Sequence, residues 1–176
     1  MSESVMAFAA REYDYLACTG PDAVDLLGRI STGDLRLLHG AMTTGFTAFT
    51  SNQGKMLDWC VAIQSPKGFI LRCSKGRGLR IKEWVEKYII MEDAAVSDVS
   101  DEWKSFIVKG VAQPETFGLP KLPDPGSLAE AGGAFYLPCL PAMSDFVDVM
   151  VPSDGAQAWA AELEKHGALA LEPSIL

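Results

Sequence analysis

Three consecutive strand-type segments between two helix-type segments constrain the fold of this chain more than any other feature. The strand-type segments cover residues 41–50, 56–64 and 69–73, where apolar and polar residues alternate or apolar residues form short runs. Residues 51–55 and 65–68 join them and carry the Gly, Pro, Asn and Ser residues typical of tight turns. Strands joined by tight turns run antiparallel, whereas parallel strands need a long crossover. The order therefore predicts an α+β fold, with antiparallel sheets and packed helices.

The two flanking helices are predicted from apolar residues at helical spacing. Pro21 and Asp22 open the first, because proline suits the first helical turn and an aspartate there faces the positive end of the helix dipole. The second covers about residues 77–89. Further strands are expected at residues 13–19, 95–99, 104–109, 134–139, 145–151 and 168–172, with a third helix beginning near residue 152.

A change in composition suggests how the chain is divided. Residues 118–133 hold seven Gly or Pro residues and are typical of a loop or a connector between lobes. We therefore expect a larger α+β lobe over residues 13–112 and a smaller one over residues 113–176. A chain of 176 residues can bury roughly 70% of its unfolded surface, so it needs no metal or disulfide for stability.

The net charge of −8, from 15 basic and 23 acidic residues, disfavours nucleic acid and anionic membranes as partners. The charge is uneven, however, since seven of the fifteen basic residues lie between Lys67 and Lys87. Lys75, Arg77 and Arg80 are among them, and such a cluster suits a small anion. The alternative is an ordinary solvated helix face.

Four cysteines, Cys18, Cys60, Cys73 and Cys139, are scattered along the chain without a CxxC pair. Metal-site spacing is absent, so no metal ion is expected, and the thiols are expected to be reduced and buried. Residues 1–12 do not resemble a signal peptide, and no apolar run approaches the roughly 20 residues of a membrane span. A cytoplasmic protein is the resulting prediction.

Two acidic residues lie in otherwise apolar strand segments. Asp58 interrupts residues 56–63, and Asp148 interrupts residues 146–151. Burying an unpartnered carboxylate costs several kcal/mol, so each side chain should face a cleft or meet a hydrogen-bond donor. Asp58 is therefore a candidate for binding or proton transfer, with a solvent-facing strand position as the alternative.

Five blocks in series resemble the sequence pattern of one known protein family. Residues 19–35 (TGPDAVDLLGRISTGDL) resemble the family's G-x-D-A-x-x-F-L-x-x-L-x-T-N-D-V opening. Residues 50–58 (TSNQGKMLD) resemble its L-N-x-x-G-G-x-x-D-D hairpin, and residues 69–89 the strand and helix that follow. Residues 108–110 resemble its Q-G-P turn, and residues 146–152 (FVDVMVP) its G-Y-E-I-x-x-P segment.

Together these blocks resemble the folate-binding family of the glycine cleavage T-protein, an aminomethyltransferase. The resemblance implies the T-protein folate-binding fold without its C-terminal barrel, with tetrahydrofolate as the ligand. Asp58 falls on the family's catalytic aspartate, which positions or deprotonates the folate amine that receives a one-carbon unit. Asp148 falls on a glutamate that binds the pterin ring. Our own addition is that Lys75, Arg77 and Arg80 are available for the glutamate tail of folate. The implied function is aminomethyl or methyl transfer to tetrahydrofolate.

Departures from the family pattern leave the enzymatic activity open. Trp59 replaces the second Asp of the hairpin. The sequence also lacks the segments that follow in longer relatives, including the K-G-C-Y-x-G-Q-E motif of the iron–sulfur-maintenance branch. The chain also resembles the small gamma subunit of heterotetrameric sarcosine oxidase. A non-catalytic subunit or structural module of an amine-oxidising or folate-dependent complex is therefore the alternative. A partner subunit or a second copy would then complete the site. A third possibility is a domain that has lost folate and binds another small anion.

Overall fold

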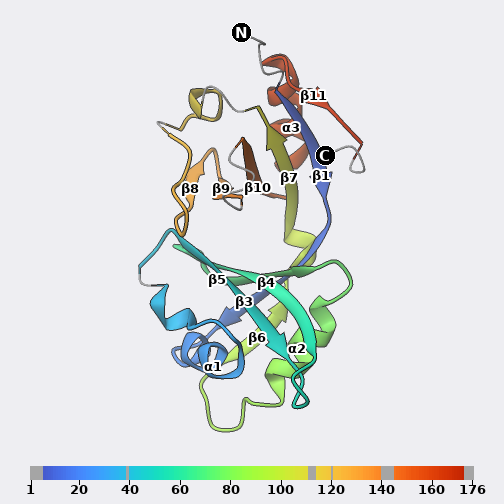
Figure 1. The fold of residues 1–176 in the computed structure, drawn as a ribbon. Helices are drawn as coiled ribbons and strands as arrows, with labels where there is room; N and C mark the ends of the chain where they lie inside the picture. Colours follow the sequence, from blue (N-terminus) through green and yellow to red (C-terminus); the bar gives the residue numbers. More distant parts are fainter. Residues whose placement is uncertain (1–5, 39, 111–113, 120, 140–144, 173–176) are drawn as a thin grey trace. The chain divides into compact units, whose positions relative to one another are not determined.

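The chain forms two compact units, one of residues Tyr13–Ser100 and one that combines Met1–Glu12 with Asp101–Leu176. The computed structural model describes residues 6–38, 40–110, 114–119, 121–139 and 145–172. Each unit pairs one β-sheet with helices (Figure 1), so the predicted α+β class is confirmed.

A five-stranded antiparallel sheet in the order β3-β4-β5-β2-β6 organises the unit Tyr13–Ser100. Its strands are β2 (Tyr13–Thr19), β3 (Thr43–Thr50), β4 (Met56–Ser65), β5 (Gly68–Ser74) and β6 (Ala95–Asp98). Its helices are α1 (Ala23–Ile30) and α2 (Gly78–Glu86). Strands β3 to β5 are the three consecutive segments predicted from the sequence, and the flanking helices are confirmed as well.

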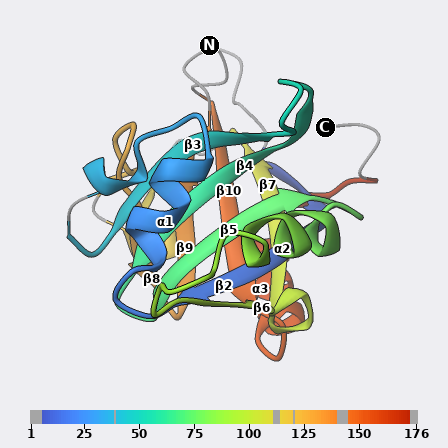
Figure 2. The same cartoon turned by 90° about the horizontal axis from the view of Figure 1, so that it is seen from below.

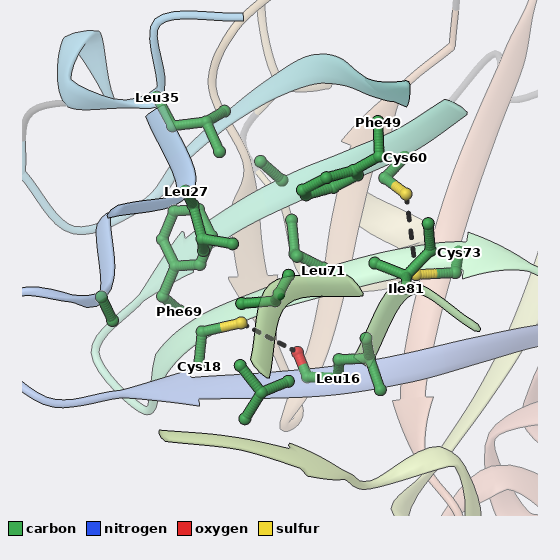
Figure 3. Packing of buried hydrophobic residues seen from close by; sticks show 14 of the residues in the cluster. Leu16, Cys18, Leu27, Leu35, Phe49, Cys60, Phe69, Leu71, Cys73 and Ile81 are labelled. Atoms are coloured by element: carbon green, nitrogen blue, oxygen red, sulfur yellow. Dashed lines mark hydrogen bonds between the residues drawn. The ribbon is translucent and has the colours of Figure 1, made fainter. Parts of the chain in front are cut away.

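Both helices of this unit cover the same face of the sheet (Figure 2). One buried cluster joins both helices to strand residues and includes Leu26 and Leu27 of α1 and Ile81 and Val85 of α2. The strand residues alternate along each strand, as expected for one face of a sheet. They include Leu16, Cys18, Cys60, Ala62, Phe69, Leu71 and Cys73 (Figure 3).

The second unit contains a six-stranded sheet in the order β11-β1-β7-β10-β9-β8. Its elements are β1 (Ala7–Arg11), β7 (Trp103–Lys109), β8 (Ala129–Ala131), β9 (Ala134–Pro138), β10 (Phe146–Pro152), α3 (Ala156–Lys165) and β11 (Leu169–Ala170). All pairs are antiparallel except β1 with β11. Trp159 of α3 packs on the sheet, stacked on Phe106 at 4.7 Å between ring centroids and edge-on to Phe8.

The units differ from the expected lobes of residues 13–112 and 113–176. Strand β7 pairs with β10 over seven residues and with β1 over five, so its hydrogen bonds tie it to the six-stranded sheet. Strand β1, which the sequence did not predict, lies between β7 and β11. Among the described residues, no helix is long and apolar enough to cross a membrane.

Glu92, in the loop between α2 and β6, ties that loop to α1. Its carboxylate accepts hydrogen bonds from the backbone N–H groups of Ile90 at 2.9 Å and Met91 at 3.1 Å. Arg29 Nη2 donates to it at 2.9 Å. The pKa of Glu92 is lowered from 4.5 to about 2 by the Ile90 amide, the Arg29 guanidinium and the Met91 amide.

Glu92→Gln is therefore expected to destabilise the protein in a pH-dependent way. A lowered folded-state pKa stabilises the fold fully above pH 4.5, and this stabilisation is lost as the pH falls towards about 2. Thermal unfolding of both proteins between pH 2 and pH 7 measures the effect. The melting temperatures should differ at pH 6 and converge towards pH 2; a difference independent of pH would contradict this assignment.

Candidate functional site

Asp58 lies on β4, opposite Phe49 of β3, and only 7% of its surface is exposed. Both carboxylate oxygens accept hydrogen bonds from Ser74, the last residue of β5. The Ser74 backbone N–H donates to Oδ2 at 2.8 Å, and its hydroxyl donates to Oδ1 at 2.7 Å. The donors expected for a buried carboxylate are therefore present, and they hold its orientation.

The Ser74 hydroxyl is the group that could transfer a proton between a ligand and Asp58. Ser74 is exposed, whereas Asp58 is buried, so Ser74 is the more open to solvent of the two hydrogen-bonded residues. A hydroxyl that donates to a carboxylate can also accept a proton from a bound group. This arrangement can move a proton from a ligand to Asp58 without exposing the carboxylate.

Two cysteines complete a buried cluster with Asp58. Cys60 Sγ lies 3.6 Å from Cys73 Sγ, between β4 and β5 (Figure 3). The same sulfur lies 3.7 Å from Asp58 Oδ2. The hydrogen bond with Cys73, burial and the negative charge of Asp58 all raise the pKa of the Cys60 thiol. The spacing of the cysteines along the chain did not predict this cluster, because Cys60 and Cys73 lie on different strands and are 13 residues apart.

The basic residues Lys75, Arg77 and Arg80 follow Ser74 directly, at the start of α2, and all three are exposed. Lys75 Nζ lies 3.3 Å from Asp14 Oδ1, and Asp14 Oδ2 accepts the backbone N–H of Gly78 at 2.8 Å. The Gly78 amide at this turn is therefore occupied by the protein's own Asp14.

Asp148 lies in the other unit, on β10, opposite Ile107 of β7 and Leu137 of β9. Only 9% of its surface is exposed. Val147 and Val149 are part of the cluster beneath α3, so Asp148 lies on the opposite face of the sheet, as its position in the sequence predicts. The structure thus brings Asp58 and the basic segment into one unit and places Asp148 in the other.

Trp59 does not join the Asp58 cluster, because adjacent strand residues point to opposite faces. Its ring stacks on Phe46 of β3, with 4.7 Å between centroids and an interplanar angle of 9°. Both rings are almost half exposed. The residue that departs from the family hairpin therefore forms an exposed aromatic pair.

Solved structures similar to this fold include an aminomethyltransferase and a sarcosine oxidase. Glycine cleavage system aminomethyltransferase T from Bartonella henselae matches with a TM-score of 0.79 and 16% identity, over 97% of this chain and 48% of that one. One chain of heterotetrameric sarcosine oxidase from Corynebacterium sp. U-96, in complex with pyrrole 2-carboxylate, matches this chain with a TM-score of 0.63 and 9% identity. That match covers 93% of this chain and 84% of that one. No protein-family model and no curated protein matches the sequence.

The fold is therefore of the T-protein type, as the sequence resemblance implied. The chain spans about half the length of the aminomethyltransferase chain that it matches. At these identities, the similarity establishes the fold alone.

Proposed function

We propose that this chain is a folate-binding, T-protein-like module that handles one-carbon units on tetrahydrofolate. The observation that carries the proposal is the fold similarity to an aminomethyltransferase over 97% of the chain. The sequence blocks that resemble the same family include both acidic residues that interrupt apolar strands.

Asp58 is the proposed catalytic carboxylate. The Ser74 hydroxyl, exposed and hydrogen-bonded to Asp58 Oδ1, takes the proton from the folate amine as its nitrogen bonds to the one-carbon unit. Ser74 passes its own proton to Asp58 in the same step. The second bond, from the Ser74 N–H to Oδ2, keeps the carboxylate in place during this transfer.

Asp148 and the basic segment are the proposed binding residues. Asp148 accepts hydrogen bonds from the N–H groups of the pterin ring, because a carboxylate with little exposure binds such donors strongly. Arg77 and Arg80 bind the carboxylates of the glutamate tail. Lys75 contributes less, since Asp14 already balances its charge.

Asp148→Ala should weaken tetrahydrofolate binding by about 10- to 100-fold, since a hydrogen bond to a charged group contributes roughly 1.5–3 kcal/mol. Asp58→Asn should leave the affinity within about threefold but lower one-carbon transfer by about 10²- to 10⁴-fold, the usual contribution of a positioned acid or base. Calorimetry and a transfer assay measure the two effects.

Asp25→Asn is the matched control, because Asp25 is an exposed aspartate on α1 that pairs with Arg29. It should match the wild type in affinity and transfer. Thermal unfolding of each variant shows that the protein remains folded. Unchanged affinity in Asp148→Ala together with unchanged transfer in Asp58→Asn would overturn these assignments.

A second candidate function is a non-catalytic subunit of a larger complex. The match to heterotetrameric sarcosine oxidase favours it, because that match covers most of both chains. Light scattering and co-purification from the source organism test it. A stable complex with another subunit is the expected result, and a monodisperse monomer that binds tetrahydrofolate alone would contradict it.

A further inference from the structure

The cluster of Asp58, Cys60 and Cys73 has the chemistry of a metal site. We propose that these three side chains bind one divalent metal ion of the zinc type, with Asp58 Oδ2 and the two sulfur atoms as ligands. The three ligand atoms lie within 4.8 Å of one another, and all three residues are buried. This proposal stands independently of folate binding.

Two of the three distances between the ligand atoms fit tetrahedral coordination, and the third is within 4.8 Å. Zinc–sulfur bonds of about 2.3 Å and zinc–oxygen bonds of about 2.0–2.2 Å place neighbouring ligand atoms roughly 3.5–3.8 Å apart in a tetrahedron. The observed separations are 3.6 Å between the two sulfurs and 3.7 Å between Cys60 Sγ and Asp58 Oδ2. A metal ion can therefore enter with little movement of the strands.

The electrostatics of the cluster also favour a cation. Two thiols and a carboxylate lie together, and the contacts described for them include donors from Ser74 but no cationic group. A divalent ion binds the two cysteines as thiolates and releases their protons.

Ser74 supplies the supporting contacts that metal sites require. Its N–H and hydroxyl fix the Asp58 carboxylate, as the hydrogen-bonding partners of ligating carboxylates do. The fourth position is left for water.

The mixture of ligands selects the metal. Magnesium and calcium prefer oxygen ligands alone, and monovalent copper prefers sulfur alone. Two thiolates with one carboxylate suit zinc, and cobalt(II) is its spectroscopic substitute.

Metal binding would withdraw Asp58 from proton transfer, so the metal-loaded protein should lose one-carbon transfer while the metal-free protein keeps it.

Titration of the reduced, metal-free protein with cobalt(II) tests the proposal. One equivalent should produce thiolate-to-cobalt charge-transfer absorption and the visible bands of tetrahedral cobalt, and zinc should abolish both. Cys60→Ala and Cys73→Ala should each remove the absorption. Asp58→Asn should weaken binding at least about tenfold, since even the loss of an outer partner typically costs 10- to 100-fold.

Cys18→Ala is the matched control. Cys18 is buried in the same apolar cluster, where burial and then Cys73 raise its pKa to about 12, but it is not one of the three ligands. This variant should bind cobalt(II) as the wild type does.

Two results would overturn the proposal: no absorption from a folded, fully reduced wild type, or absorption that persists in both Cys60→Ala and Cys73→Ala. Tetrahydrofolate affinity in Cys60→Ala should remain at the wild-type level. Failure of metal binding is therefore distinguishable from failure of folate binding.

Discussion

Gly20→Ala should destabilise the protein by about 4 kcal/mol or more, at the upper end of single substitutions. Gly20 joins β2 to α1 with a φ angle of +98°, and a Cβ atom there would lie 2.1 Å from the backbone oxygen of Asp93. Backbone movement cannot relieve this clash easily. Asp22 N–H donates to that same oxygen at 3.2 Å, and Asp93 N–H donates to Asp22 Oδ2 at 2.8 Å.

Gly54→Ala provides the matched control for this substitution. Gly54 also has a positive φ angle, +73°, but nothing lies within 4 Å of the position that a Cβ would take. Only the cost of the left-handed conformation remains, about 1–2 kcal/mol. Urea unfolding measures both, and equal losses of stability would show that the contact with Asp93 does not constrain the loop.

Phe49→Ala is expected to have the second-largest effect, a loss of about 3–5 kcal/mol. The Phe49 ring is fully buried in the cluster beneath α1 and α2, near Cys60 (Figure 3). Its removal leaves a cavity between the sheet and the helices. Because Asp58 pairs with Phe49, the cavity also borders the candidate site.

Phe46→Ala tests the same chemical change on the same strand. The Phe46 ring is 46% exposed and stacks on Trp59, so its loss should cost only about 0.5–1.5 kcal/mol. Chemical denaturation of the two variants should therefore give clearly different midpoints. Similar midpoints would mean that the two faces of this sheet contribute equally to stability.

Most of the unit Tyr13–Ser100 could be predicted because one face of its sheet is apolar and its turns are short. Strand β2 was predicted with the bounds that the structure has, and β3 to β5 within about two residues. Strand β1 could not be predicted in the same way. Ala7, Phe8 and Ala9 are all buried, so the strand lacks the alternation that identifies a half-exposed strand.

Long-range pairing explains the other differences in the fold. Strand β7 was predicted as a strand, but nothing local indicates that its partners are β1 and β10. Strand β8 has three residues and lies in the Gly- and Pro-rich segment that predicted a loop. Its pairing with β9 overrides that local preference.

The candidate site was predictable only in part. Asp58 could be identified because a carboxylate in an apolar strand requires a partner. Its partner Ser74 and the neighbouring Cys73 depend on the register of β4 and β5, in which Val61 pairs with Arg72. That register places Cys60 across from Cys73, although 13 residues separate them along the chain.

Calorimetric titration of the wild-type chain with tetrahydrofolate is the decisive measurement of folate binding. The expected result is saturable binding of one tetrahydrofolate per chain, with the affinity reduced in Asp148→Ala. A folded chain that gives no binding heat at any of several temperatures, up to millimolar tetrahydrofolate, would contradict it.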